Sequence, residues 1–167
     1  MMDQIRGDHA LQSNAACSHI FMRATVLQGY SRDVVAADNT KSIVSITSHA
    51  LAAFFKVPVV VMLVTEDRVA SLEQVGDVEP QEAELEAAQS SLANGMVVRS
   101  GVYPNLASHF DFWPVETAEG QKAVIGLAFD PDERPSAPDT LVNIVVRVFA
   151  LVLDRQHVRR QTHGSGE

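Results

Sequence analysis

The chain has 167 residues, of which 46% are apolar and 20% are charged, and this composition predicts a single globular domain rather than a disordered chain. Its net charge of −8 argues against binding to nucleic acids, because modules that bind phosphate backbones usually carry a basic face. The one cysteine, Cys17, excludes a framework of disulfide bonds and a structural zinc site built on cysteines.

The first half of the chain predicts two helices followed by two strands. Over residues 15–37, and again over 40–55, apolar side chains recur at steps of three and four residues, which is typical of helices with one buried face. Residues 57–64 are mostly β-branched and apolar on both faces, so we expect a central strand that is covered on both sides. Residues 69–75 predict a weaker second strand.

The second half predicts a helix, two strands joined by a hairpin, and a long final helix. We expect them at about residues 81–93, 109–116, 122–130 and 136–161. Ser136 is expected to cap the last helix, and Asp139, three residues later, is expected to make the reciprocal contact, much as in a capping box. The order of elements predicts an α/β (α+β) domain with a central antiparallel sheet and helices on both faces.

We expect one domain over residues 15–161, between flexible ends at 1–14 and 162–167. The longest apolar stretch, over 57–64, is far shorter than the roughly 18–20 residues that a helix needs to cross a bilayer. The N-terminal residues lack the apolar run of a secretory signal. A cytoplasmic protein without direct membrane insertion is therefore expected.

No motif in the chain indicates an active site. Ser48 and His49 match the start of the phosphoacceptor box of histidine kinases, but the acidic residue that should follow is missing, so we interpret His49 as an ordinary helix residue. The six histidines lack the paired spacing of metal ligands, and Cys17 is interpreted as structural or incidental. Three acidic residues are interpreted as a solvated helix face: Glu82, Glu84 and Glu86. We expect no catalytic residue, metal or cofactor.

Aromatic residues gather where the loop over 96–108 meets the next strand. Because side chains alternate along a strand, one of Phe112 and Trp113 should face the core and the other a surface or a pocket. Packing in the core is one reading of these aromatics, and a small apolar pocket under the loop is the other. For that pocket we predict five residues that contact a small-molecule ligand: Tyr103, His109, Phe110, Phe112 and Trp113.

A series of short motifs runs through the chain from about Arg23 to Arg160. The motifs are Leu-Gln-Gly-Tyr-Ser-Arg at 27–32, an alanine-containing stretch ending in Asn-Gly at 85–95, Gly101, Phe-Trp-Pro-Val at 112–115, Ala-Val-Ile-Gly-Leu-Ala-Phe at 123–129, and Leu-Val-Leu-Asp-Arg at 151–155. Their order resembles that of the GAF-type sensory domain of KdpD-type sensor histidine kinases, which sense potassium and osmotic stress. Val102 departs from the family's usual loop threonine.

The resemblance implies a GAF/PAS-like sheet of roughly five or six strands, with the first and last helices packed together on one face and commonly paired in a dimer. The residues agree, because both helices are longer than the sheet face they would cover, and their extra apolar stripes can bury those of a partner. A basic cluster closes the last helix at Arg155, His157, Arg159 and Arg160. We interpret it as a cap on that helix, or as part of a helix that continues into an effector or pairs with its copy.

These observations predict a non-catalytic regulatory domain that relays a signal through its terminal helices as a homodimer, within or related to a KdpD-type two-component sensor histidine kinase. One alternative is a stand-alone dimerisation module without a ligand. Another is an enzyme on a GAF scaffold, such as a methionine-sulfoxide reductase, although that chemistry needs a resolving thiol besides Cys17.

Overall fold

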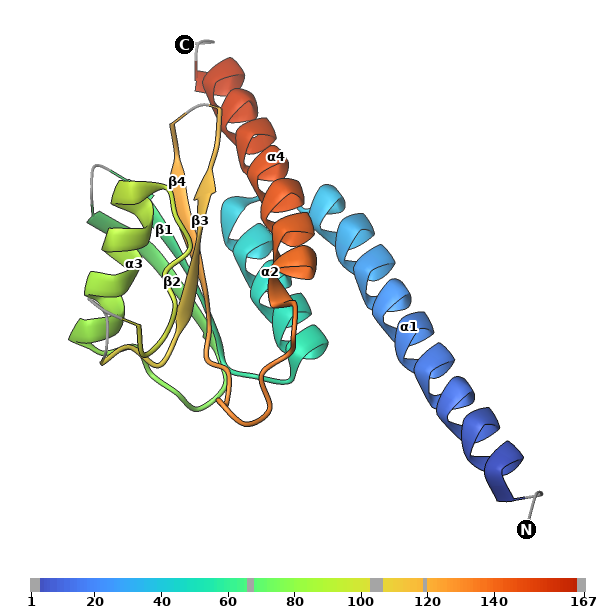
Figure 1. Ribbon diagram of the computed structural model, residues 1–167. Helices are drawn as coiled ribbons and strands as arrows, with labels where there is room; N and C mark the ends of the chain where they lie inside the picture. Colours follow the sequence, from blue (N-terminus) through green and yellow to red (C-terminus); the bar gives the residue numbers. More distant parts are fainter. Residues whose placement is uncertain (1–3, 66–67, 103–106, 119, 165–167) are drawn as a thin grey trace.

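The computed structural model describes residues 4–65, 68–102, 107–118 and 120–164. Within this part of the chain, four helices and four strands follow the predicted order (Figure 1). Their bounds are α1 Gln4–Ala36, α2 Thr40–Phe55, β1 Val59–Thr65, β2 Arg68–Val75, α3 Glu82–Asn94, β3 Asp111–Glu116, β4 Lys122–Leu127 and α4 Pro138–Gly164.

The strands form one antiparallel sheet in the order β2-β1-β4-β3. Strand β1 lies between β2 and β4, and its first five residues are buried, so the prediction of a central strand covered on both sides is confirmed. The α+β class with an antiparallel sheet and helices on both faces is also confirmed.

The described residues contain fewer strands than the five or six that the resemblance implied, because a further ladder beside β3 stops after one pair. Val98 and Phe112 exchange backbone hydrogen bonds of 3.0 and 2.8 Å. Two residues further on, the Ser100 amide donates to the side chain of Asp111 instead of a strand carbonyl, over 2.8 Å. The carbonyl of Phe110 accepts from the Ser108 hydroxyl. Side chains thus take the hydrogen bonds that would extend the ladder.

The sheet separates two cores. Helices α2 and α4 and the end of α1 cover one face, and α3 covers the other (Figure 1). Trp113 belongs to the first core and Phe112 to the second, so the predicted alternation is confirmed. The expectation that one of them would reach a surface or pocket was wrong, because helices cover both faces and the two residues are 1% and 0% exposed.

Helix α1 begins at Gln4, well before the residue predicted as its start, and most of it lies outside the body of the protein (Figure 1). Among the side chains of α1 that the structure describes, those of the last turns, including Tyr30 and Val34, pack against α2 and α4. Residues 20–25 are exposed. The terminal helices are therefore packed together as predicted, with the contact confined to the end of α1.

Side chains of α4 hold the corner between α1 and α2. Arg155 Nη2 donates to the Val35 carbonyl over 2.5 Å, and Gln156 Nε2 donates to the Ala37 carbonyl over 3.0 Å. Arg160 Nη2 donates to Thr40 Oγ1 over 3.0 Å. The basic cluster was predicted to cap the end of α4. Arg155 instead satisfies a carbonyl at the end of α1. Sequence spacing could not reveal this, since the residues are 120 positions apart.

Tyr30 is expected to make the fold sensitive to alkaline pH. Burial raises the pKa of its phenol to about 12 from the ordinary 10.0, and a weak hydrogen bond to Thr47 only partly offsets this effect. The unfolded chain therefore ionises before the folded one does. Stability should stay constant below pH 10 and fall between pH 10 and 12. Melting temperatures from pH 8 to 12 should fall more steeply for the wild type than for Tyr30→Phe, and parallel curves would contradict this assignment.

Candidate functional site

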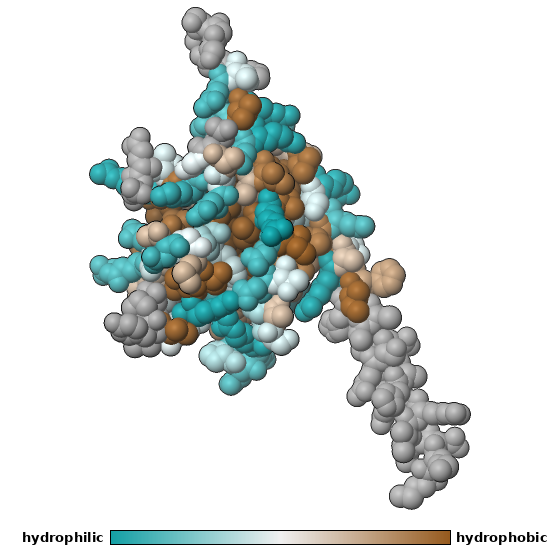
Figure 2. All heavy atoms as spheres, turned by 45° about the horizontal axis from the view of Figure 1, so that its top comes forward, coloured by the Kyte–Doolittle hydropathy of each residue, from teal (hydrophilic) through white to brown (hydrophobic). Residues whose placement is uncertain are grey.

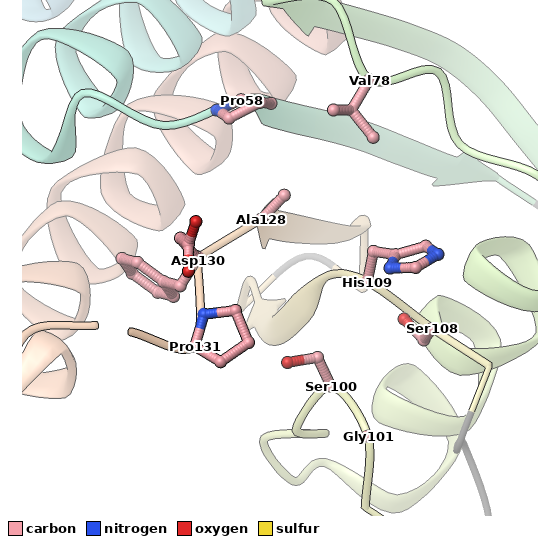
Figure 3. A pocket seen from close by; sticks show the side chains of 10 residues that line it. Pro58, Val78, Ser100, Gly101, Ser108, His109, Ala128, Asp130 and Pro131 are labelled. Carbon is pink, nitrogen blue, oxygen red and sulfur yellow. The ribbon is translucent and has the colours of Figure 1, made fainter. Parts of the chain in front are cut away.

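A cavity of about 560 Å³ opens at one end of the sheet (Figure 3). It lies where β1 and β3 begin and where β2 and β4 end, so four connections contribute to its wall. Its lining consists of Pro58, Val78, Ser100, Gly101, Ser108, His109, Ala128, Phe129, Asp130 and Pro131.

The wall of the cavity is mostly apolar and carries a few polar groups. In Figure 3, Pro58 and Val78 lie along one side and Ser100 lies across from them. The Ser108 hydroxyl is occupied, since it donates to the carbonyl of Phe110 over 3.0 Å. Among the described residues, the structure shows no hydrogen bond to the Ser100 hydroxyl or to the imidazole of His109.

The five predicted ligand contacts do not all meet at this cavity. His109 lines it and is exposed. Phe110 and Phe112 stack in the core under α3 with ring centroids 5.9 Å apart, and Trp113 packs in the core on the other face. Tyr103 lies outside the described residues. Of the four predicted residues that the structure describes, His109 is thus the one that lines the cavity. Ligand contact stays a prediction for all five.

Glu84 is buried and holds the segment that carries His109, so its assignment to a solvated face was wrong. It is 2% exposed. One carboxylate oxygen accepts from the Gln81 amide over 2.9 Å and the other from the His109 amide over 3.0 Å. The spacing of Gln81 and Glu84 is that of a capping box, a signal already present in the sequence. The two other acids of the trio, Glu82 and Glu86, are exposed as predicted.

A fully buried carboxylate lies behind the Ser100 side of the cavity. Asp111, at the start of β3, is 0% exposed and accepts three donors. Oδ1 takes the Ser100 amide at 2.8 Å, Oδ2 takes Arg99 Nη1 at 3.1 Å, and Arg134 forms a further ion pair with Oδ2. Burial of a carboxylate is costly unless it is paired and hydrogen-bonded, and here all three donors serve that purpose. No sequence motif pointed to this residue.

Arg99 joins this carboxylate to a second one at the start of α4. Its Nη2 lies 2.6 and 2.7 Å from the two oxygens of Asp139, and Trp113 Nε1 donates to Asp139 Oδ1 over 2.8 Å. The Arg99 hydrogen bond, followed by that of Trp113, lowers the pKa of Asp139. Asp139 therefore accepts hydrogen bonds from Arg99 and Trp113, whereas the sequence suggested that it would form a capping box with Ser136. We call Asp111, Arg99, Arg134, Asp139 and Trp113 the Asp111 network.

Three polar groups interrupt the apolar wall of the cavity. A hydroxyl, an imidazole and the exposed carboxylate of Asp130 face an apolar wall, which is the usual composition of a small-molecule pocket. Within the described residues, no three side chains of His, Cys, Asp or Glu are grouped to hold a metal ion. The described part of the chain also holds no helix long and apolar enough to cross a membrane.

Comparison with known proteins shows which fold this is. No family model matches the chain, and no curated protein matches its sequence. Among solved structures, the native GAF domain of the potassium sensor histidine kinase KdpD from Escherichia coli superposes with a TM-score of 0.68, over 83% of this chain and 98% of that domain. The fold is a GAF fold. The sequence identity is 14%, and the likeness to a KdpD GAF domain that the motifs predicted is confirmed at the level of the fold.

Proposed function

We propose that the chain is a non-catalytic sensory domain that binds a small molecule and relays the signal through α1 and α4. The observation that carries this proposal is the placement of α1 on a GAF fold. Its last turns are tied to α4 by Arg155 and Gln156, while its outer turns run away from the sheet (Figure 1). A change in packing at α4 can therefore reach a helix that extends beyond the domain.

The same helix supports a homodimer through the terminal helices. Ile20, Phe21 and Met22 are 67%, 75% and 66% exposed, and Figure 2 shows hydrophobic side chains where α1 leaves the body. On α4, Leu151 is 69% exposed. An isolated helix is marginally stable in water, so the outer turns of α1 gain from packing on another helix. Ile20 lies seven residues before Leu27, which is partly buried against the core, so a partner would extend the apolar stripe that begins there.

Ile20→Asp is expected to weaken the dimer at least about tenfold, because it places a charge in the helix stripe that the partner would cover. Light scattering after size-exclusion chromatography at micromolar concentrations measures this dissociation constant. The matched control is Leu72→Asp, at a residue of β2 that is 41% exposed and lies far along the chain from both terminal helices. A monomeric wild type at high micromolar concentration, or equal weakening by both variants, would refute the dimer.

Ligand binding in the cavity is expected to raise the melting temperature by about 5–10 °C at roughly 100 times the dissociation constant. The probes are nucleotides, cyclic nucleotides and potassium salts, each tested separately in a thermal-shift assay. Val78→Trp, which narrows the cavity, should abolish the shift, while Val69→Trp on the exposed side of β2 should keep it. A dimer that no probe stabilises would favour the alternative of a ligand-free dimerisation module.

The fold shared with a GAF domain of a potassium sensor kinase favours a cytoplasmic module that is part of, or related to, a KdpD-type two-component sensor histidine kinase. The kinase chemistry would then reside in other segments. The alternative of a thiol-dependent enzyme is tested by Cys17→Ser, which leaves a non-catalytic sensor unaffected.

A further inference from the structure

The cavity and the start of α4 are connected through a few described side chains. Ser100 belongs to both, since it lines the cavity and its amide donates to Asp111. Its neighbour Gly101 also lines the cavity, with a φ of +67° and nothing within 4 Å of the place where a Cβ would stand. The backbone at Gly101 therefore has open space on the side where a side chain would stand, and both Ser100 and Gly101 lie where an occupant of the cavity would contact them.

The other side of this connection is anchored in the sheet. Asp111 opens β3, which pairs with β4 along its whole length, and the side chain is fully buried. A displacement of residues 100–101 would consequently move Arg99 relative to a fixed Asp111. Arg99 is the residue that can respond, because its side chain is 30% exposed and spans two carboxylates on different elements.

The far end of the connection is the first turn of α4. Asp139 receives both guanidinium contacts of Arg99 Nη2 and the indole hydrogen bond of Trp113. Trp113 is fixed in the core, at 1% exposure, with the Arg99 guanidinium carbon 5.1 Å from its ring centroid. If the Arg99 side chain moves away, Asp139 at the start of α4 keeps its hydrogen bond to Trp113 and loses its ion pair with Arg99.

We propose that Arg99 is a positioning residue that couples occupancy of the cavity to the first turns of α4. An occupant that displaces Ser100 and Gly101 draws Arg99 away from Asp139 and loosens the start of this helix. The inference rests on the proposed function in one respect, namely that the cavity is the place where a signal enters. It adds the route by which that signal reaches a terminal helix.

A tethered occupant tests the coupling without a known ligand. In a Cys17→Ser background, Val78→Cys places a thiol on the cavity wall across from Ser100 (Figure 3). Labelling with benzyl methanethiosulfonate places an aromatic ring in the cavity, and the methyl reagent is the small control. Val69→Cys with the benzyl label controls for the reagent on an exposed site of β2. Hydrogen exchange of the amides at 142–148 reports opening of α4.

The benzyl label at position 78 should speed exchange at 142–148 by about 5- to 150-fold over the methyl label, the usual range of allosteric coupling. Arg99→Lys should remove this response, because a lysine cannot hold both carboxylates as the guanidinium fork does. Asp139→Asn is a second, milder variant with the same expectation. A carboxyl titration by NMR adds a readout beyond stability: the benzyl label should raise the pKa of Asp139 toward its ordinary value.

Equal exchange with the two labels, or the same response in the Arg99→Lys and Asp139→Asn backgrounds, would overturn the inference. These outcomes are distinct from failure of the proposed function. If a probe binds in the thermal-shift assay but the tethered ring leaves α4 unchanged, the sensor stands and this route fails. If the ring loosens α4 but no probe binds, the route stands and small-molecule sensing fails.

Discussion

Asp111→Asn is expected to lower the free energy of unfolding by about 3 kcal/mol. The substitution keeps the shape of the side chain and removes the charge that pairs with Arg99 and Arg134. Breaking a buried ion pair costs about 3–5 kcal/mol, since the remaining charge is left without its partner. The lower end applies here because the two arginine side chains are 30% and 31% exposed and can regain water. Urea unfolding followed by circular dichroism measures the change as a lower midpoint at constant slope.

Asp33→Asn is the matched control for this prediction. Asp33 also pairs with an arginine, Arg32, but the two side chains are 52% and 80% exposed. An exposed pair contributes little, so this control should change the unfolding free energy by less than about 0.5 kcal/mol. If both variants lost the same amount, burial would not be what makes Asp111 important, and the account of the Asp111 network would be wrong.

Gly126→Ala is expected to cost about 2–3 kcal/mol, because the centre of the sheet has no room for a methyl group. Gly126 lies on β4, directly opposite Phe112 on β3 and Val60 on β1. An added Cβ would stand 2.6 Å from Phe112 Cε1 and 2.6 Å from Val60 Cγ1. Both neighbours are fully buried in the core under α3, so neither can move aside without disturbing that core.

Two further variants separate this clash from the general effect of replacing a glycine. Gly29→Ala on α1, where nothing lies within 4 Å of the added methyl group, should stabilise the fold by about 0.5–1 kcal/mol. Combining Gly126→Ala with Phe112→Leu should cost at least about 1 kcal/mol less than the sum of the single changes, because the smaller side chain leaves space. Additive effects would show that the ring of Phe112 is not the obstacle.

Local patterns were enough to predict the elements of the fold. The run of β-branched residues at 57–64 predicted β1, and the three- and four-residue steps over 40–55 predicted α2 with its observed bounds. These patterns succeed because burial of one or two faces imposes a period on the chain itself. The GAF likeness also followed from the order of short motifs, and the fold agrees with it.

The candidate site was only partly predictable. His109 was expected at a pocket and lines the cavity, but Phe110, Phe112 and Trp113 are core residues, since aromatic composition does not distinguish a pocket wall from a buried layer. Glu84 looked like part of a solvated face because acids usually are, and its capping-box spacing was the signal that would have corrected this.

Apart from the early start of α1, the sequence alone located the helices and strands, since propensity, capping and hydrophobic period act between residues that are near along the chain. The tertiary structure alone decided which charges are paired. Arg99 lies 12 residues from Asp111 and 40 from Asp139, and Arg155 lies 120 residues from the carbonyl it caps. Contacts over such separations leave no periodic trace, because a charged side chain takes whichever partner the folded chain brings within reach.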